Sequence, residues 1–422
     1  MIRASVATSP KYRLVHAHFA VGLLGMVGFA LALVFRAPWF TGHHFQAATL
    51  GLAHLVALGW LVPVALGALL QLAPVLFEGK TGPEWLGWTA FALYVAGAAG
   101  LIAHMFALAF GPGMFGSGVL ILLAFLLHAG LLLATMVRGR AFGLTGAFVL
   151  SAGFHLLVAA TLGLVLAWNL WKPFLPKNHL VVLSGHAHAA GLGFFGLLVM
   201  GVGDRLLEMF LVSHGASRKP AWLALFATNA GVLALTVSYT FGPWPGLTFA
   251  GAILAATGVC AFLVRVAAIV EKRIRKRLDV SMRHTAASFA YLGVAAFGGA
   301  SLALFDLPYA VAERLTNAYG LVALVGFLGT LIIGQLGKIL PFLVWLHRFE
   351  PLAGLKKIPL ASDLLPEKAQ RLSFWALNAG VPVLALGVAV DLVAVRVAGA
   401  LLFAAGVLLA ARNLAVVCRS QP

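Results

Sequence analysis

Long apolar stretches, separated by short polar segments, make up most of this 422-residue chain. Hydrophobic residues account for 62% of the sequence and charged residues for only 10%, with a mean hydropathy of +1.01. Soluble domains contain about 45–50% apolar and about 25% charged residues. A water-soluble fold cannot hide this much apolar surface, because its exterior must still be covered. The composition therefore predicts a polytopic membrane protein whose main partner is the lipid bilayer.

The apolar stretches predict an all-α fold with twelve transmembrane helices, since about 20 apolar residues span a bilayer. Proline, glycine and charged residues punctuate the breaks between them. The predicted spans cover residues 13–35, 47–77, 85–110, 113–137, 143–168, 179–212, 220–241, 246–270, 285–305, 315–346, 372–391 and 395–415.

Basic residues predict the orientation of these spans. With a cytoplasmic N-terminus, only 5 of the 29 lysines and arginines fall outside, namely Arg36, Lys172, Lys177, Arg314 and Arg396. The other 24 fall inside, which agrees with the positive-inside rule. We therefore expect a multi-pass protein of the bacterial cytoplasmic membrane with both termini in the cytoplasm. Orientation also accounts for the net charge of +17, so no nucleic-acid partner is expected.

One segment recurs three times at nearly constant spacing. The pairs Gly59-Trp60, Gly193-Phe194 and Gly326-Phe327 are separated by 134 and 133 residues, and each is followed eight residues after its glycine by another glycine. This spacing corresponds to four spans. It predicts a single membrane domain, 1–422, with internal repeats at approximately 1–142, 143–278 and 279–422. Functional sites of repeat-built membrane proteins usually lie at the repeat interface.

Several of the 14 histidines have a simple explanation. His128 and His155, near the middle of their spans, are expected to bond to neighbouring helices. Solvation or headgroup contact is enough to explain those at inner helix ends or in loops: His16, His18, His214, His284 and His347.

Four other histidines share one layer. His54, His104, His186 and His188 lie roughly 9–15 Å from the outer boundary, at 1.5 Å of rise per residue. Imidazole suits iron and copper, and an apolar slot with histidine ligation suits haem. The alternative is that these histidines only pack helices together. We expect them to bind haem iron or a nearby metal.

The local sequence adds two details to this layer. His186 and His188 are two positions apart on a helix, so their side chains point about 200° from one another and serve two neighbouring gaps. Gly185, Gly191 and Gly193 remove side-chain bulk nearby, which predicts room for a flat macrocycle.

Two cysteines, Cys260 and Cys418, exclude a disulfide framework, a cysteine-based zinc site and covalent haem attachment through C-x-x-C-H. The expected cofactor is therefore haem b, one or two per chain, with copper or non-haem iron as further candidates.

The segment Gly185-His186-Ala187-His188 through Gly193-Phe194, followed by Gly201, resembles the H-x-H-x-x-x-x-G-W helix of the catalytic subunit of cbb-type haem-copper oxidases and nitric oxide reductases. That superfamily also has twelve spans with pseudo-threefold symmetry. The resemblance implies that the first histidine of the pair binds a high-spin haem iron and the second a low-spin haem.

The chain departs from this pattern in four ways. The histidine pair is on the sixth span, where the family has it on the tenth, and residues 220–241 lack the adjacent copper-ligand histidines. No histidine is followed four residues later by tyrosine, and only Glu208 and Asp391 approach the spans as carboxylates. An enzyme of this kind would be an oxidoreductase lacking the standard copper site and the cross-linked tyrosine. If the family geometry is rotated by one repeat, His54 and His186 share a gap.

These observations predict a haem-b-binding integral membrane protein in redox or nitric-oxide/oxygen chemistry, acting in electron transfer, sensing or reduction, with quinol or cytochrome c as candidate electron donors. Two alternatives stay open: a non-enzymatic membrane protein that transports or delivers a metal or cofactor, and a structural partner subunit. The catalytic residues are left unassigned.

Overall fold

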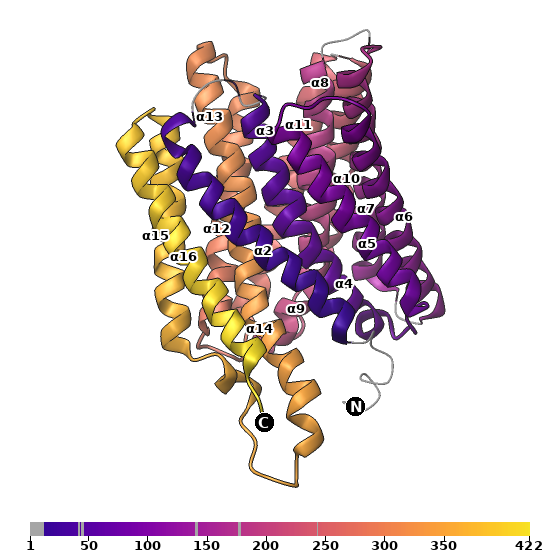
Figure 1. Cartoon of the computed structure of the whole chain (residues 1–422), viewed down its shortest axis with the longest axis vertical. Helices are drawn as coiled ribbons and strands as arrows, with labels where there is room; N and C mark the ends of the chain where they lie inside the picture. Colours follow the sequence, from indigo (N-terminus) through magenta and orange to yellow (C-terminus); the bar gives the residue numbers. More distant parts are fainter. Residues whose placement is uncertain (1–11, 41–42, 44–45, 140–141, 176–178, 243) are drawn as a thin grey trace. The chain divides into compact units, whose positions relative to one another are not determined.

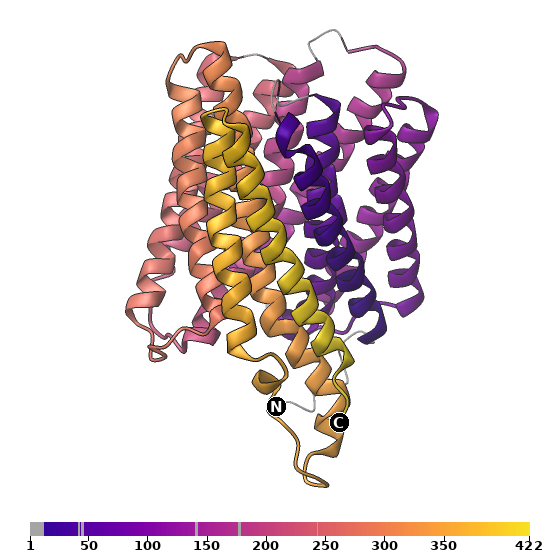
Figure 2. The ribbon, with the colours of Figure 1, turned by 60° about the vertical axis from the view of Figure 1, so that its left-hand side comes forward.

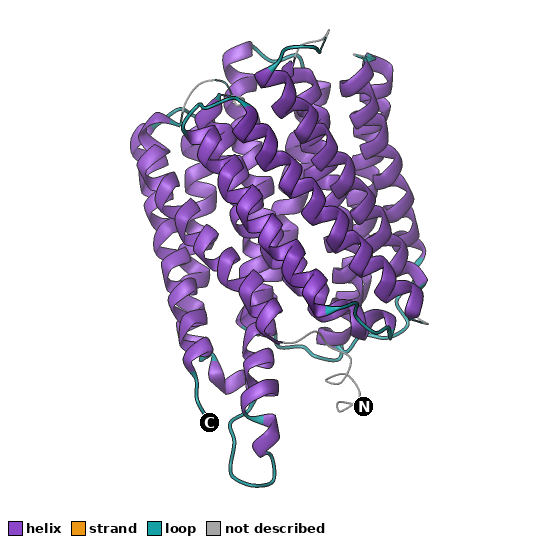
Figure 3. Cartoon of the chain, turned by 45° about the vertical axis from the view of Figure 1, so that its right-hand side comes forward, coloured by secondary structure: helices purple, strands orange, loops and turns teal. Residues whose placement is uncertain are grey.

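The computed structural model describes residues 12–40, 43, 46–139, 142–175, 179–242 and 244–422. Helices connected by short loops make up these residues, and no strand occurs in them (Figure 3). The predicted all-α fold is therefore confirmed. Lys177, one of the basic residues assigned to the outside, lies outside the described residues.

Figure 1 labels the helices of the chain. The chain divides into two compact units, each built from segments that are discontinuous in sequence. The described part of the first unit comprises residues 12–18, 65–139, 142–175, 179–242, 244–276 and 299–306. Its helices are the end of α4 (Val62–Phe77), α5 (Glu84–Phe106), α6 (Pro112–Arg138), α7 (Gly143–Trp171), α8 (His179–His188), η3 (Ala189–Gly196), α9 (Leu197–Leu211), α10 (Lys219–Phe241) and α11 (Pro245–Glu271), together with the first turns of α2 (Tyr12–Arg36).

The second unit comprises residues 19–64, 277–298 and 307–422. Besides the rest of α2, it contains η1 (Ala37–Trp39), α3 (Ala47–His54), η2 (Leu55–Leu61), most of α12 (Val280–Leu304), α13 (Tyr309–Leu321), η4 (Val322–Gly329), α14 (Thr330–Arg348), η5 (Glu350–Leu352), η6 (Ala361–Leu364), α15 (Glu367–Ala389) and α16 (Val393–Arg419). Within this unit α15 and α16 run side by side (Figure 2).

Eleven helices in the described residues are long and apolar enough to cross a membrane. The helical stretch α8–η3–α9, His179–Leu211, stands at the place of the predicted sixth span. Large apolar side chains cover the outside of the helices; Leu24, Phe35, Val137 and Phe297 are each about three-quarters exposed. Such a surface suits hydrocarbon and not water. The chain is a polytopic membrane protein, as its composition predicts.

Three helices contain a π-helical segment of seven or eight residues. These segments, η2, η3 and η4, begin at Leu55, Ala189 and Val322, so their starts are separated by the same 134 and 133 residues as the sequence repeat. π-Helical turns are rare and frequently mark functional sites. The predicted single domain and the predicted repeat boundaries stay predictions.

Close helix packing in the first unit depends on glycine. A Cβ atom on Gly231 of α10 would collide with the backbone of Ala255 on α11, and one on Gly258 would collide with Thr228. Helices in membranes approach closely where small residues face one another, since dispersion contacts drive their association. Gly231 and Gly258 therefore allow α10 and α11 to pack closely.

Candidate functional site

The structure places His186 and His188 against different helices of the first unit. The Nδ1 atom of His186 donates a hydrogen bond to the backbone oxygen of Ala159 on α7, at 2.8 Å. The ring of His188 stacks on Tyr239 of α10, with centroids 5.5 Å apart, and its Nδ1 atom donates to the oxygen of Ser184 at 2.8 Å. The two imidazoles thus point to different neighbours, as their spacing on a helix predicts.

His104 lies in the last turn of α5, and its Nδ1 atom donates to the backbone oxygen of Gly100 at 2.7 Å. The imidazole lies against Gly113 of α6, where a Cβ atom would collide with its Nε2 atom. Glycine at position 113 therefore makes the room that this ring occupies.

His54 belongs to the second unit, at the end of α3 and directly before the π-helical segment η2. Its Nδ1 atom donates to the oxygen of Leu50 at 2.8 Å. The predicted pairing of His54 with His186 stays a prediction.

All four predicted ligands share one property. In His54, His104, His186 and His188 the Nδ1 atom faces a carbonyl oxygen, which can only accept a hydrogen bond, so Nδ1 carries the proton. The neutral imidazole then presents a lone pair at Nε2. Metal-ligating histidines are usually oriented in this way, by a hydrogen bond from the other ring nitrogen.

Two of the three glycines around His186 and His188 have a different role from the predicted one. Gly185 faces Thr236 and Thr240 of α10, and Gly193 faces the ring of His155, so both are occupied by protein contacts. A Cβ atom on Gly191 would meet nothing within 4 Å. Only Gly191 of the three therefore leaves open space for a macrocycle; the other two allow close helix packing.

His18 and His128 form a pair in the first unit that was not predicted from the sequence. His18 was expected to be solvated at an inner helix end, but the structure buries it completely, and His128 is 6% exposed. Their Nε2 atoms are 3.2 Å apart. The prediction for His18 was wrong because the first turns of α2 pack against α5 and α6, where Phe91 lies 4.7 Å from the His18 ring. No pattern in the sequence links two residues 110 positions apart.

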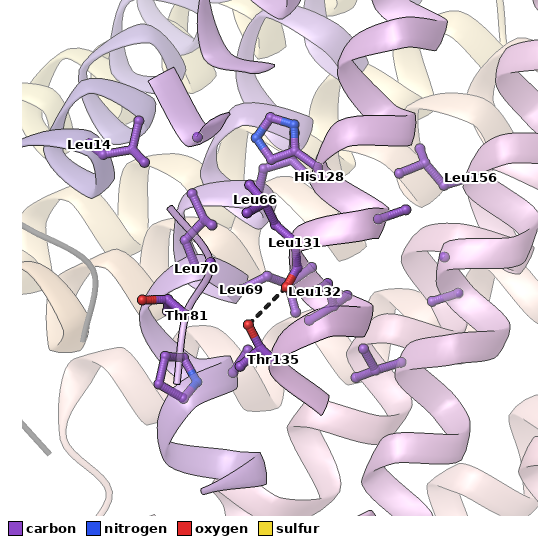
Figure 4. A pocket seen from close by; sticks show the side chains of 18 of the residues that line it. Leu14, Leu66, Leu69, Leu70, Thr81, His128, Leu131, Leu132, Thr135 and Leu156 are labelled. Carbon is purple, nitrogen blue, oxygen red and sulfur yellow. Dashed lines mark hydrogen bonds between the residues drawn. The ribbon is translucent and has the colours of Figure 1, made fainter. Parts of the chain in front are cut away.

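A cavity of about 180 Å³ adjoins His128 (Figure 4). Leucines such as Leu66, Leu132 and Leu156 line most of its wall. The hydroxyl group of Thr135, one of the few polar groups on the wall, donates to the oxygen of Leu131 on its own helix at 2.8 Å (Figure 4). The wall is therefore predominantly apolar. Engineered apolar cavities of about 150 Å³ stay dry and bind small apolar molecules.

A second buried polar group of this unit is an ion cluster around Arg265. Arg265 of α11 is completely buried, and it donates to Asp204 at 2.6 Å, to Glu208 at 2.5 Å and to the backbone oxygen of Ser217 at 3.1 Å. Asp204 is a carboxylate inside the predicted sixth span that was not predicted from the sequence. Its spacing of four residues from Glu208, on one helix face, was the signal that could have found it.

The donor set favours some metal groups over others. In the part of the chain that the structure describes, no group of three or more histidine, cysteine or acidic residues could hold a metal ion. A structural zinc ion needs four protein ligands, so these residues do not fit one. Haem takes only one or two ligands from protein, and single part-buried histidines with a fixed tautomer fit it.

Comparison with solved structures reveals a shared fold. A haem-copper terminal oxidase dimer, determined by cryo-electron microscopy, matches with a TM-score of 0.72 over 97% of this chain and 84% of the oxidase chain, at 12% sequence identity. No family model matches the chain, and no curated protein matches it. At this identity the likeness shows the fold alone.

Proposed function

We propose that this chain is a haem-b-binding integral membrane protein that works in redox or nitric-oxide/oxygen chemistry, by electron transfer, sensing or reduction. The observation that carries the proposal is the state of four histidines. His54, His104, His186 and His188 each have Nδ1 bonded to a carbonyl oxygen, in a fold like that of a haem-copper oxidase.

These four residues would hold one or two haems through their imidazole nitrogens. Bound haem would supply an iron that changes oxidation state and binds diatomic gases. The role of the protein is to fix the imidazole tautomer and to keep the surroundings apolar. Haem of the b type is proposed because no C-x-x-C-H motif is present. Copper or non-haem iron is a further candidate at this layer.

An absorption spectrum tests the proposal directly. The protein, purified in detergent from haem-replete cells, is expected to show a Soret band and, after reduction with dithionite, the α band of haem b. Acidified acetone should extract the pigment. A colourless protein, or pigment that stays on the protein after extraction, would refute haem b binding.

Ligand variants test the individual residues. His54→Ala and His186→Ala should each change the spectrum or lose haem, and the double variant should be little worse than either, if both serve one iron. A separate spectral loss in His188→Ala indicates a second haem. His155→Ala is the matched control: it removes a buried imidazole whose Nε2 atom is 3.2 Å from Asn229, and it should leave the spectrum intact.

The proposed setting is the bacterial cytoplasmic membrane, with both termini in the cytoplasm and quinol or cytochrome c as electron donor. The distribution of lysine and arginine supports this orientation. Reporter fusions at Pro112 and Gly242 should read external, and a fusion at Gly139 cytoplasmic. A cytoplasmic reading at either of the first two positions contradicts the proposed topology.

A further inference from the structure

His18 and His128 point ring nitrogens at one another in the core of the first unit. Their Nε2 atoms are 3.2 Å apart, and their ring centroids are 5.4 Å apart with the ring planes at 90°. The nitrogens therefore lie between the two ring centres, and not beside them. Both side chains are at least nine-tenths buried.

Hydrogen bonds elsewhere on the two rings decide what these nitrogens carry. The Nδ1 atom of His18 donates to the oxygen of Leu14 at 2.8 Å, and that of His128 donates to the oxygen of Ala124 at 2.9 Å. In neutral histidines with these bonds, neither Nε2 atom has a proton, so two lone pairs face one another. In the other tautomer of one ring, the repulsion would lie at its Nδ1 atom, because the lone pair there would face a carbonyl oxygen.

A single cation between the two nitrogens removes this conflict. We infer that His18 and His128 form a two-histidine site for one monovalent copper ion. Metal–nitrogen bonds of about 2.0 Å place the two nitrogens about 4 Å apart, so the rings need to separate by less than about 1 Å. A haem would instead require its whole macrocycle between two rings that now touch.

The surroundings favour monovalent copper over other ions. No third histidine, cysteine or carboxylate completes a cluster there, among the residues that the structure describes. Zinc takes four ligands, and magnesium or calcium takes oxygen ligands. Copper(I) accepts two nitrogen donors in a line, and its single charge costs less to bury in an apolar region than a double charge does.

The neighbouring cavity extends this inference to a third ligand. His128 lies on the wall of the apolar cavity of about 180 Å³ (Figure 4). A small uncharged diatomic molecule could enter it and bind a copper ion held at Nε2. This site is separate from the four proposed haem ligands, so its failure would leave the proposed function untouched.

Anaerobic titration with copper(I), in competition with a coloured chelator, tests the site. The purified protein should bind one equivalent, and added carbon monoxide should give one infrared band of a copper(I) carbonyl. His18→Leu and His128→Leu should each weaken copper binding by at least about 100-fold, since even outer-shell changes cost 10- to 100-fold. His155→Leu is the matched buried control and should bind copper as the parent does.

Two further variants keep the test decisive. Gly153 lines the cavity, and a Cβ atom there would meet nothing within 4 Å, so Gly153→Leu should retain copper and lose the carbonyl band. If a leucine variant at a histidine fails to fold, His128→Met preserves a soft donor and should retain copper with sulfur in its coordination shell. Three results would overturn the inference. The parent protein could bind no copper, both leucine variants could bind copper as the parent does, or the leucine variants could lose haem and not copper.

Discussion

Two of the buried polar groups in the first unit differ, because the protein completes only one of them. Arg265 directs its guanidinium nitrogens at two carboxylates and a carbonyl oxygen, so every charge has a partner. His18 and His128 instead present opposed lone pairs in an apolar region. A buried group that the chain satisfies by itself needs nothing further, whereas an incomplete pair is a site for a ligand. Removing side chains from each group tests this difference.

Arg265→Leu has the largest expected effect. It leaves Asp204 buried without its cation, whereas Glu208 keeps the exposed Arg218 at 3.7 Å. Losing one partner of a buried ion pair costs about 3–5 kcal/mol. Thermal unfolding of the protein in detergent measures the change. The triple variant Arg265→Leu, Asp204→Leu, Glu208→Leu removes all three charges and should recover most of the loss. A cost below about 1 kcal/mol for the single variant would show that the cluster is not a closed structural unit.

Gly193→Ala has the next largest effect. The added Cβ atom would lie 2.7–2.9 Å from atoms of His155, which must then move away from Asn229. Overpacking of this kind costs about 1–3 kcal/mol. Gly191→Ala is the control on the same π-helical segment. Its Cβ atom would meet nothing within 4 Å, so it should cost no stability and raise the unfolding free energy by up to about 1 kcal/mol, since alanine favours a helix more than glycine does. Equal costs at both positions would mean that His155 does not fill this space.

His18→Leu and His128→Leu, measured without copper, should each change stability by less than about 1 kcal/mol. Neither substitution strands a donor, because the Nε2 atom of the remaining histidine only accepts hydrogen bonds and its Nδ1 bond is kept. The stability cost of each histidine variant should therefore be much smaller than that of Arg265→Leu. A loss of about 3 kcal/mol or more in the copper-free protein would show that the histidine pair stabilises the fold, as the ion cluster does.

Arg277→Ala has the smallest expected effect. Arg277 contacts Glu367 at 3.2 Å in the second unit, but its side chain is 78% exposed. Exposed ion pairs contribute about 0–1 kcal/mol, and salt screens them. Unfolding at low and high salt should therefore hardly separate this variant from the parent. A cost comparable to that of Arg265→Leu would contradict the view that burial makes the difference between the two arginines.

The amino-acid sequence determined the membrane-spanning architecture, because the length and apolarity of each span are local properties. The repeated glycines of the sequence also lie in the three π-helical segments: Gly59 in η2, Gly193 in η3 and Gly326 in η4. Divergence of His186 and His188 followed from helical geometry alone. The ligand role of His54, His104, His186 and His188 stays a prediction. It is supported by their positions in the sequence and by the hydrogen bonds of their Nδ1 atoms.

Only the tertiary structure decided which polar groups meet. His18 and His128 are 110 residues apart, and Arg265 is 61 residues from Asp204, so no local period reports either contact. His18 has the sequence surroundings of a solvated helix end, yet it is buried because α5 and α6 pack over it. The physical reason is that burial and pairing depend on which helix faces pack together, and that is a property of the whole unit and not of any one span.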